Sequence, residues 1–199
     1  IQLKIHSFKK EFGKTLDEIT KKDKKTIPCT YCGVFRRKLL NEKAIELGAT
    51  KLATGHNLDD EAQSILMNQL RKNIRASAIL GPITGIKDDP SFVRRIKPFY
   101  FLTEKEVITF AYINNILDKY VECPNSILGY RRTIQETLND LENKYPGTKH
   151  NIISSFLSVL PLLKKSFESA EIKKCKLCNA PTSKDICQAC VLLERIKSF

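Results

Sequence analysis

Residues 49–73 read ATKLATGHNLDDEAQSILMNQLRKN and join a short strand, a glycine turn and a helix in direct succession. Residues 49–54 are typical of a short buried strand, and Gly55 forms the turn after it. Asn57 or Asp59 then supplies the N-cap of the helix. This succession predicts an α/β fold with a parallel sheet, in which ligands bind outside the carboxyl ends of the strands.

Three acidic residues crowd the first turn of that helix: Asp59, Asp60 and Glu61. Their position beyond a strand end makes them candidates for holding a ligand. The plainer interpretation, that they only complement the positive end of the helix dipole, stays open. The apolar residues expected to face inward are Ile65, Leu66 and Leu70.

A second helix is predicted upstream, in residues 26–49 (TIPCTYCGVFRRKLLNEKAIELGA), with a C-x-x-C pair at its start and Gly48 at its end. The positive end of the helix and the adjacent Arg36 and Arg37 favour the thiolate forms of Cys29 and Cys32. Such pairs occur in redox dithiols, zinc half-sites and iron–sulfur clusters, and half-buried unreactive cysteines remain an alternative. The expected apolar face comprises Phe35, Leu39, Leu40, Ile45 and Leu47.

Further elements are expected on both sides of these helices. Ile1, Leu3 and Ile5 alternate as in a half-buried strand, so the chain is expected to begin inside a strand of something longer. Thr103 and Glu106 form a capping box that opens a helix ending near residue 114. A strand is predicted at residues 119–121, with Cys123 just beyond it. Two helices follow Gly129, separated at Pro146–Gly147.

The composition indicates a folded, basic protein. The 199 residues carry 34 Lys and Arg against 22 Asp and Glu, for a formal net charge of +12, and 42% are hydrophobic. Such a charge suits a nucleic-acid partner, although many basic proteins bind none. No apolar run approaches the roughly 18–20 residues needed to span a bilayer, which argues against an integral membrane protein.

Seven cysteines cannot all pair within one chain, and a reducing compartment is expected. Four of them follow the pattern C-x2-C-x8-C-x2-C: Cys175, Cys178, Cys187 and Cys190. Two such pairs on tight turns present four thiolates at the tetrahedral geometry of zinc. Few apolar residues lie between them, so we expect the metal to fold this segment, and a reduced or disulfide-paired loop is the alternative.

Four motifs occur in the order found in the tRNA 2-thiolation family, which the chain resembles over nearly its whole length. They are CTYCGVFRR (29–37), ATGHNLDDEA (53–62), ECPNS (122–126) and the terminal four-cysteine segment. The family comprises iron–sulfur-dependent, ATP-using tRNA uridine thiolases, including archaeal and eukaryotic cytosolic enzymes that act on the wobble uridine. The resemblance implies a PP-loop ATP-pyrophosphatase domain with small zinc modules.

The resemblance also implies roles for individual residues. Cys29, Cys32 and Cys123 match the three cysteines that bind a [4Fe–4S] cluster, and they are expected to meet at one site. Gly55 and Asp60 match positions lining the pocket for ATP and Mg2+. Arg36 stands where some members carry a catalytic lysine, so a cation is kept but a proton-transferring amine is not. Cys175, Cys178, Cys187 and Cys190 match the C-terminal zinc ligands.

One family feature is absent. No SGGKDS-type phosphate loop and no N-terminal zinc knuckle occur in the 199 residues. The chain is therefore expected to be an N-terminally incomplete form, inactive in isolation. Its expected parts are a partial PP-loop domain (1–148), a helical connection (149–172) and a zinc knuckle (173–199).

The implied reaction is adenylation of the uracil C2 oxygen by ATP, followed by its replacement with sulfur. Three thiolates leave one iron of the cluster open to sulfide. The expected partners are tRNA and a sulfur donor, either sulfide or a ubiquitin-like carrier, with a cytoplasmic location; a homodimer is left open. Two alternatives remain: a cluster-free thiolase working by persulfide exchange, and a non-catalytic zinc-containing tRNA-binding module.

A group of cations is expected on or beside turns rich in glycine and proline: Lys72, Arg75, Arg94, Arg95 and Lys97. The first four are predicted to contact tRNA phosphates, and a solvated face is the alternative. A separate prediction is that losing Cys178 or Cys187 unfolds only the tail beyond about Lys173, because the metal supplies the folding free energy of that tail.

Overall fold

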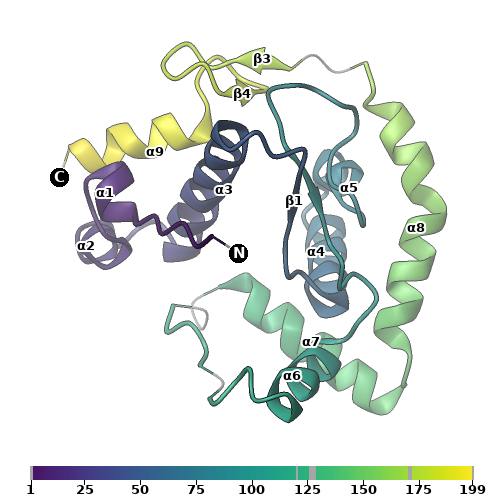
Figure 1. Cartoon of the computed structure of the whole chain (residues 1–199). Coiled ribbons are helices and arrows are strands. Elements are labelled where there is room, and N and C mark those ends of the chain that lie inside the picture. Colours follow the sequence, from purple (N-terminus) through teal and green to yellow (C-terminus); the bar gives the residue numbers. More distant parts are fainter. Residues whose placement is uncertain (1, 120, 126–128, 170–171, 199) are drawn as a thin grey trace. The chain divides into compact units, whose positions relative to one another are not determined.

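The computed structural model describes residues 2–119, 121–125, 129–169 and 172–198, which form two compact units (Figure 1). The first unit combines both ends of the chain, Ile1–Leu47 and Glu171–Phe199, and the second comprises Gly48–Ala170. Helices predominate, and both units also contain short strands. The predicted α/β class is confirmed, with the four terminal cysteines clustered in the first unit.

The first unit packs the N-terminal helices against the C-terminal one. Its elements are α1 (Phe8–Phe12), α2 (Leu16–Lys22), α3 (Pro28–Glu46), β3 (Lys173–Lys174), β4 (Pro181–Thr182) and α9 (Gln188–Lys197). Strands β3 and β4 pair antiparallel. Aromatic rings of α1 and α3 stack, with the centroids of Phe12 and Phe35 4.4 Å apart. The buried core joins Ile19, Tyr31 and Phe35 to residues of α9 such as Leu192 and Ile196.

The second unit places helices around one parallel strand pair. Its elements are β1 (Lys51–Ala53), α4 (Leu58–Leu70), α5 (Ile74–Ile79), β2 (Arg94–Ile96), α6 (Glu104–Ile113), α7 (Tyr130–Lys144) and α8 (Thr148–Ser166). Leu52 of β1 lies opposite Arg95 of β2. Helices α4, α7 and α8 share a buried core that includes Leu58, Ile65, Leu138 and Ile153. The two helices expected after Gly129 are confirmed, as is their break at Pro146–Gly147.

Two predicted strands are wrong. Leu3 and Ile5 are 79% and 80% exposed and belong to no strand, because the chain turns into α1 at the Ser7 N-cap; Ile1 lies outside the described residues. Lys119 and Val121 form no strand either, and Tyr120 is not among the described residues. Neither segment has a hydrogen-bonded neighbour of the kind that holds β1 against β2 in the described chain.

The predicted helix faces are partly wrong. On α3 the buried residues are Pro28, Tyr31, Phe35 and Ala44, whereas Leu40, Ile45 and Leu47 are 38%, 46% and 62% exposed. Leu70 of α4 is 59% exposed. Of residues 49–54, predicted to form a buried strand, Lys51–Ala53 form β1, and both ends of this strand are exposed. Tertiary packing therefore uses a different stripe of α3 from the one that the aliphatic residues mark.

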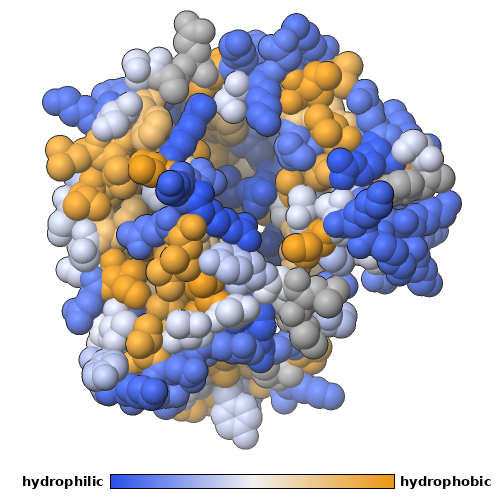
Figure 2. Space-filling model, turned by 180° about the vertical axis from the view of Figure 1, so that it is seen from behind, coloured by the Kyte–Doolittle hydropathy of each residue, from blue (hydrophilic) through white to orange (hydrophobic). Residues whose placement is uncertain are grey.

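Large apolar side chains also remain at the surface, where they form groups among the hydrophilic residues (Figure 2). Helix α6 buries none of its residues, and Phe110, Tyr112 and Ile113 are each at least 64% exposed. None of the helices in the described residues combines the length and apolar character needed to cross a membrane. The division into parts 1–148, 149–172 and 173–199 stays a prediction beside the two compact units.

Candidate functional site

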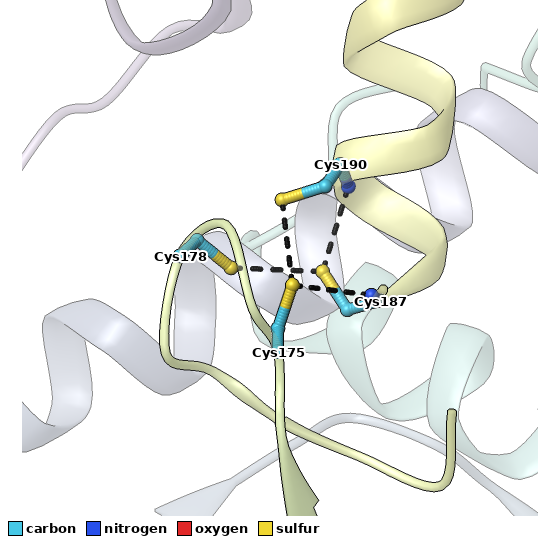
Figure 3. Close-up of side chains that lie close together, drawn as sticks. All are labelled: Cys175, Cys178, Cys187 and Cys190. Carbon is cyan, nitrogen blue, oxygen red and sulfur yellow. Dashed lines mark hydrogen bonds between the residues drawn. The ribbon is translucent and has the colours of Figure 1, made fainter. Parts of the chain in front are cut away.

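Four cysteine sulfurs converge between the β3–β4 hairpin and the start of α9 (Figure 3). The Sγ atoms of Cys175 and Cys190 lie 3.9 Å apart, and those of Cys178 and Cys187 lie 3.6 Å apart. All four sulfurs lie within 4.8 Å of one another. Tight turns produce this arrangement: Asn179 adopts φ 58° in the hairpin, and Cys187 is the N-cap of α9.

The spacing fits one tetrahedral ion. A metal–sulfur bond of about 2.3 Å places the sulfurs of a regular tetrahedron roughly 3.8 Å apart. A four-iron cluster would hold the cysteine sulfurs further apart, because each thiolate then binds a different iron. The donor set and its spacing therefore fit a single soft divalent ion such as Zn2+.

Burial and backbone donors set the charge state of these thiols. The Cys187 N–H donates to Cys175 Sγ at 3.2 Å and, against the effect of burial, lowers the pKa of the Cys175 thiol to about 6. Burial raises the pKa of Cys187 and of Cys190. A bound cation would reverse that rise, because metal coordination favours the thiolate.

Cys29 and Cys32 lie in the first two turns of α3, as predicted. Pro28 occupies the start of the helix, where its missing N–H breaks no intrahelical bond. The two cysteines are three residues apart and therefore share one helix face. Cys29 is exposed and Cys32 half-buried. The geometry thus presents both sulfurs together at the positive end of a helix.

Cys123 is an exposed residue of the second unit. It follows an irregular segment rather than the predicted strand, so the argument that two strand ends bring the cysteines together is wrong for this residue. Cys29 and Cys32 belong to the first unit, and each unit is described by itself. The meeting of the three sulfurs stays a prediction.

The three acids at the start of α4 have different environments. Asp60 accepts from the Asn57 N–H in a capping box, and its carboxylate lies 3.6 Å from Arg131. Asp59 forms a buried ion pair with Lys149 of α8 and accepts from the Glu104 N–H at 2.7 Å. Asn57 rather than Asp59 is therefore the N-cap.

Glu61 turns inward, toward the end of β2. Its carboxylate lies 2.7 Å from the Lys97 ammonium, and both side chains are at most 5% exposed. Burial raises the pKa of Glu61, and Lys97 only partly offsets this rise. Of the three acids, Asp60 is the one left 31% exposed, so it alone could reach a ligand from this turn. Complementing the helix dipole does not explain why Asp59 and Glu61 each form a buried ion pair with a lysine.

Gly55 and Arg36 are both exposed. Gly55 lies in the turn between β1 and α4, where an added Cβ would meet no atom within 4 Å. Arg36 lies on α3, in the first unit, whereas Gly55 and Asp60 lie in the second. The structure thus places Gly55 close in sequence and space to the start of α4, and the pairing of Arg36 with Asp60 stays a prediction.

The predicted basic turn region is largely not a turn. Arg94 and Arg95 lie in strand β2, and Lys97 forms a buried ion pair with Glu61. Arg94 pairs with Asp88, and burial lowers the pKa of Arg95. Lys72 lies in a turn and Arg75 on α5, and both are exposed; their contact with tRNA phosphates stays a prediction. Phosphate contacts by Arg94 and Arg95 would require breaking the Arg94–Asp88 ion pair or uncovering the half-buried Arg95 side chain.

Two residues that matter for this region were not identified from the sequence. Lys149 lies 90 positions from Asp59, and Tyr100 covers the buried Glu61–Lys97 pair with its ring centroid 5.9 Å from the Lys97 ammonium. Neither belongs to a motif. The sequence offers one hint: Lys149 lies in the first turn of a helix, where a positive charge is unfavourable unless an acidic residue pairs with it.

The chain is similar in sequence to known tRNA-modifying proteins. The tRNA 2-thiolation protein NcsA of Haloferax volcanii is 37% identical over 209 residues, covering 100% of this chain and 64% of the relative. The tRNA-5-methyluridine(54) 2-sulfurtransferase of Pyrococcus horikoshii is 39% identical over 82% of this chain and 52% of its own length. The chain belongs to the tRNA 2-thiolation protein family. No family model matches it.

A solved structure supports the same assignment. The U34-tRNA thiolase NcsA from Methanococcus maripaludis, solved with its [4Fe-4S] cluster, aligns with a TM-score of 0.78 and 34% identity. The alignment covers 98% of this chain and 61% of that protein. The chain thus spans about three fifths of the length of the two NcsA proteins.

Proposed function

We propose that the chain is the tRNA- and cluster-binding part of a tRNA uridine 2-sulfurtransferase. The observation that carries the proposal is the alignment of 98% of the chain with a thiolase whose structure contains a [4Fe-4S] cluster. The +12 charge agrees with tRNA as the partner. The wobble uridine is the proposed target because that thiolase is named for U34, and uridine 54 is the competing position.

Cys29, Cys32 and Cys123 are the proposed ligands of the cluster. The first two fit on the geometry of α3, because they share one helix face near its positive end, with Cys29 exposed and Cys32 half-buried. When bound through three thiolates, the cluster supplies an iron that is open to an exogenous sulfur atom. The chain's own contribution is to hold Cys29 and Cys32 on one helix face, with the cationic Arg36 on the same helix.

Gly55, Asp60 and Arg36 are the proposed contacts of ATP and Mg2+ in a PP-loop domain. Gly55 leaves room for a phosphate to approach the backbone at the carboxyl end of β1. Asp60 is fixed by its capping box yet stays 31% exposed, which suits a carboxylate that holds Mg2+. Adenylation would make the uracil C2 oxygen a leaving group, and Arg36 would stabilise developing negative charge.

Cys175, Cys178, Cys187 and Cys190 are the proposed zinc ligands, and their role is structural. With four protein sulfurs the ion has no open position for a substrate. A reducing cytoplasm suits a protein that depends on seven thiols. A sulfide or ubiquitin-like sulfur donor, a homodimer and the inactivity of the chain in isolation remain part of the proposal.

Anaerobic reconstitution with iron and sulfide tests the cluster. We expect about four irons per chain, and loss of most of the iron after Cys29→Ser, Cys32→Ser or Cys123→Ser. Thr103→Ala, which leaves all seven cysteines in place and lies in the second unit, serves as the control and should keep the iron. Full iron binding in the Cys123→Ser protein would contradict the proposed ligand set.

Titration calorimetry and thiouridine mapping test the enzyme. Asp60→Asn should keep iron but weaken binding of Mg2+–ATP, and cells relying on that variant should lose 2-thiouridine at position 34. A wild-type protein that forms thiouridine without iron would favour persulfide chemistry. Because the chain is proposed to be inactive in isolation, the thiouridine test uses the chain joined to a phosphate-loop segment. A joined protein that binds tRNA but restores no thiouridine would favour a binding module.

A further inference from the structure

Helix α3 presents a cation to the four-cysteine cluster. The Lys38 Nζ lies 3.7 Å from Cys178 Sγ, within hydrogen-bond distance of a sulfur acceptor. Lys38 lies three residues after the buried Phe35 and seven after the buried Tyr31, so it projects from the helix face that carries the core. Its side chain is only 14% exposed. A lysine held so far from water needs a counter-charge.

Glu42 supplies one counter-charge, and the cluster would supply a second once a metal is bound. Four thiolates and one divalent ion carry a net charge of −2. Cys175, Cys187 and Cys190 are at most 8% exposed, so this charge is largely removed from water. Two backbone N–H groups offset part of it: Cys187 donates to Cys175 Sγ, and Cys190 donates to Cys187 Sγ at 3.5 Å. Cys178 receives the Lys38 ammonium instead.

Other cations near the cluster are poorly placed for this role. Lys176 pairs with Asp185 at 2.8 Å, and both side chains are more than 60% exposed. Lys173 and Lys174 are exposed on β3. Lys38, by contrast, donates a hydrogen bond to a sulfur of the cluster.

We propose that Lys38 is a positioning and charge-compensating residue of the four-cysteine metal site, and that it raises the affinity of this site for Zn2+. The inference rests on the metal site proposed above. Lys38 also contacts Glu42, one turn further along α3. Glu42 is 39% exposed, so water screens its charge. The Lys38 ammonium has three N–H donors and can therefore bind the Glu42 carboxylate and the Cys178 sulfur together.

Zinc affinity measured in competition with a chromophoric chelator tests the proposal. Lys38→Met keeps the apolar stem but removes the charge and the donors, and we expect about tenfold weaker binding of Zn2+, in the range found for partners that hydrogen-bond to metal ligands. Lys38→Arg should bind within about threefold of the wild type. The matched control is Lys43→Met, because Lys43 lies on the same helix and pairs with Glu46.

Two further measurements separate this role from plain helix stabilisation. Glu42→Gln removes the same ion pair but leaves Lys38 on the sulfur, so it should not weaken Zn2+ binding. Substitution with Co2+ gives a thiolate-to-metal charge-transfer band, which should move to longer wavelength in Lys38→Met when the N–H···S bond is lost. That band also reports on any variant that folds only with metal.

The outcomes are distinct. Equal Zn2+ affinity and an unchanged cobalt band in Lys38→Met would overturn the role of Lys38. Equal weakening in Lys38→Met and Glu42→Gln would assign the effect to the ion pair and would also overturn it. A wild-type protein that binds no Zn2+ would overturn the proposed metal site itself, whatever the variants do.

Discussion

The two units bury polar groups in different ways. In the first, three of the buried residues are cysteines that pack with Ile19, Tyr31 and Phe35. In the second, the core is made of aliphatic and aromatic residues, with two buried ion pairs beside it, Asp59–Lys149 and Glu61–Lys97. The second unit therefore carries its own counter-charges, whereas in the first the proposed metal ion would neutralise the thiolates.

The largest expected effect is loss of the metal ligands. Cys178→Ser or Cys187→Ser should unfold α3 and α2 together with the tail, because the same core contains all of them. The sequence-based prediction confined this loss to residues beyond about Lys173. Hydrogen exchange should show lost protection in residues 16–46, with α4 and α8 unchanged. Cys123→Ser is the control, and preserved protection of α3 in Cys187→Ser would contradict the comparison.

Breaking one buried ion pair should have the next largest effect, and only in the second unit. Lys149→Met leaves the Asp59 carboxylate buried without its cation, which costs about 3–5 kcal/mol. Urea unfolding followed by circular dichroism measures the loss. Arg132→Met removes an exposed pair with Glu136 and should cost less than about 1 kcal/mol. Similar losses of unfolding free energy in both variants would mean that water reaches the Asp59 carboxylate and that the pair is not buried in solution.

Close packing of the second core can be separated from backbone strain with two glycines. Gly147 adopts φ 91° with open space around it, so Gly147→Ala should cost about 1–2 kcal/mol from strain alone. Gly81 adopts φ 123°, and an added Cβ would lie 2.9 Å from Leu160 Cδ2. Gly81→Ala should therefore cost about 1 kcal/mol more than Gly147→Ala in urea unfolding. An equal loss of unfolding free energy in the two variants would show that the Leu160 side chain shifts at no cost to make room for the added Cβ.

The smallest effect compares matching caps in the two units. Thr15 and Thr103 each form a capping box, with Glu18 and Glu106. Each Thr→Ala change should cost about 1 kcal/mol. Since folding of the first unit is linked to metal binding, Thr15→Ala should weaken Zn2+ binding about fivefold. Thr103→Ala should leave it unchanged, and a change there would show that the units are coupled.

Local signals were sufficient for the helices with clear ends. The capping box at Thr103 and the glycine after α3 predicted those boundaries correctly, because caps depend on neighbouring residues alone. The four-cysteine cluster was equally accessible, since two short turns fix its sulfurs.

Long-range pairing was not accessible. Nothing near Asp59 indicates Lys149, and nothing near Arg94 distinguishes a strand beside β1 from a basic turn. The segment from Ile1 to Ile5 alternates as a strand does, but alternation alone provides no neighbouring strand to pair with. Which stripe of α3 is buried depends on α9, more than 140 residues later in the sequence.

The first unit is assembled from residues 1–47 and 171–199, which are separated by the whole second unit. During synthesis the second unit can therefore fold before residues 171–199 of the first unit have been made. Until α9 emerges, Tyr31 and Phe35 lack the side chains that cover them, and α3 with its two cysteines has no complete core. Binding of the proposed metal by Cys175, Cys178, Cys187 and Cys190 would thus complete the core of the first unit, and a nascent chain stalled before α9 would expose an aromatic surface to chaperones and proteases.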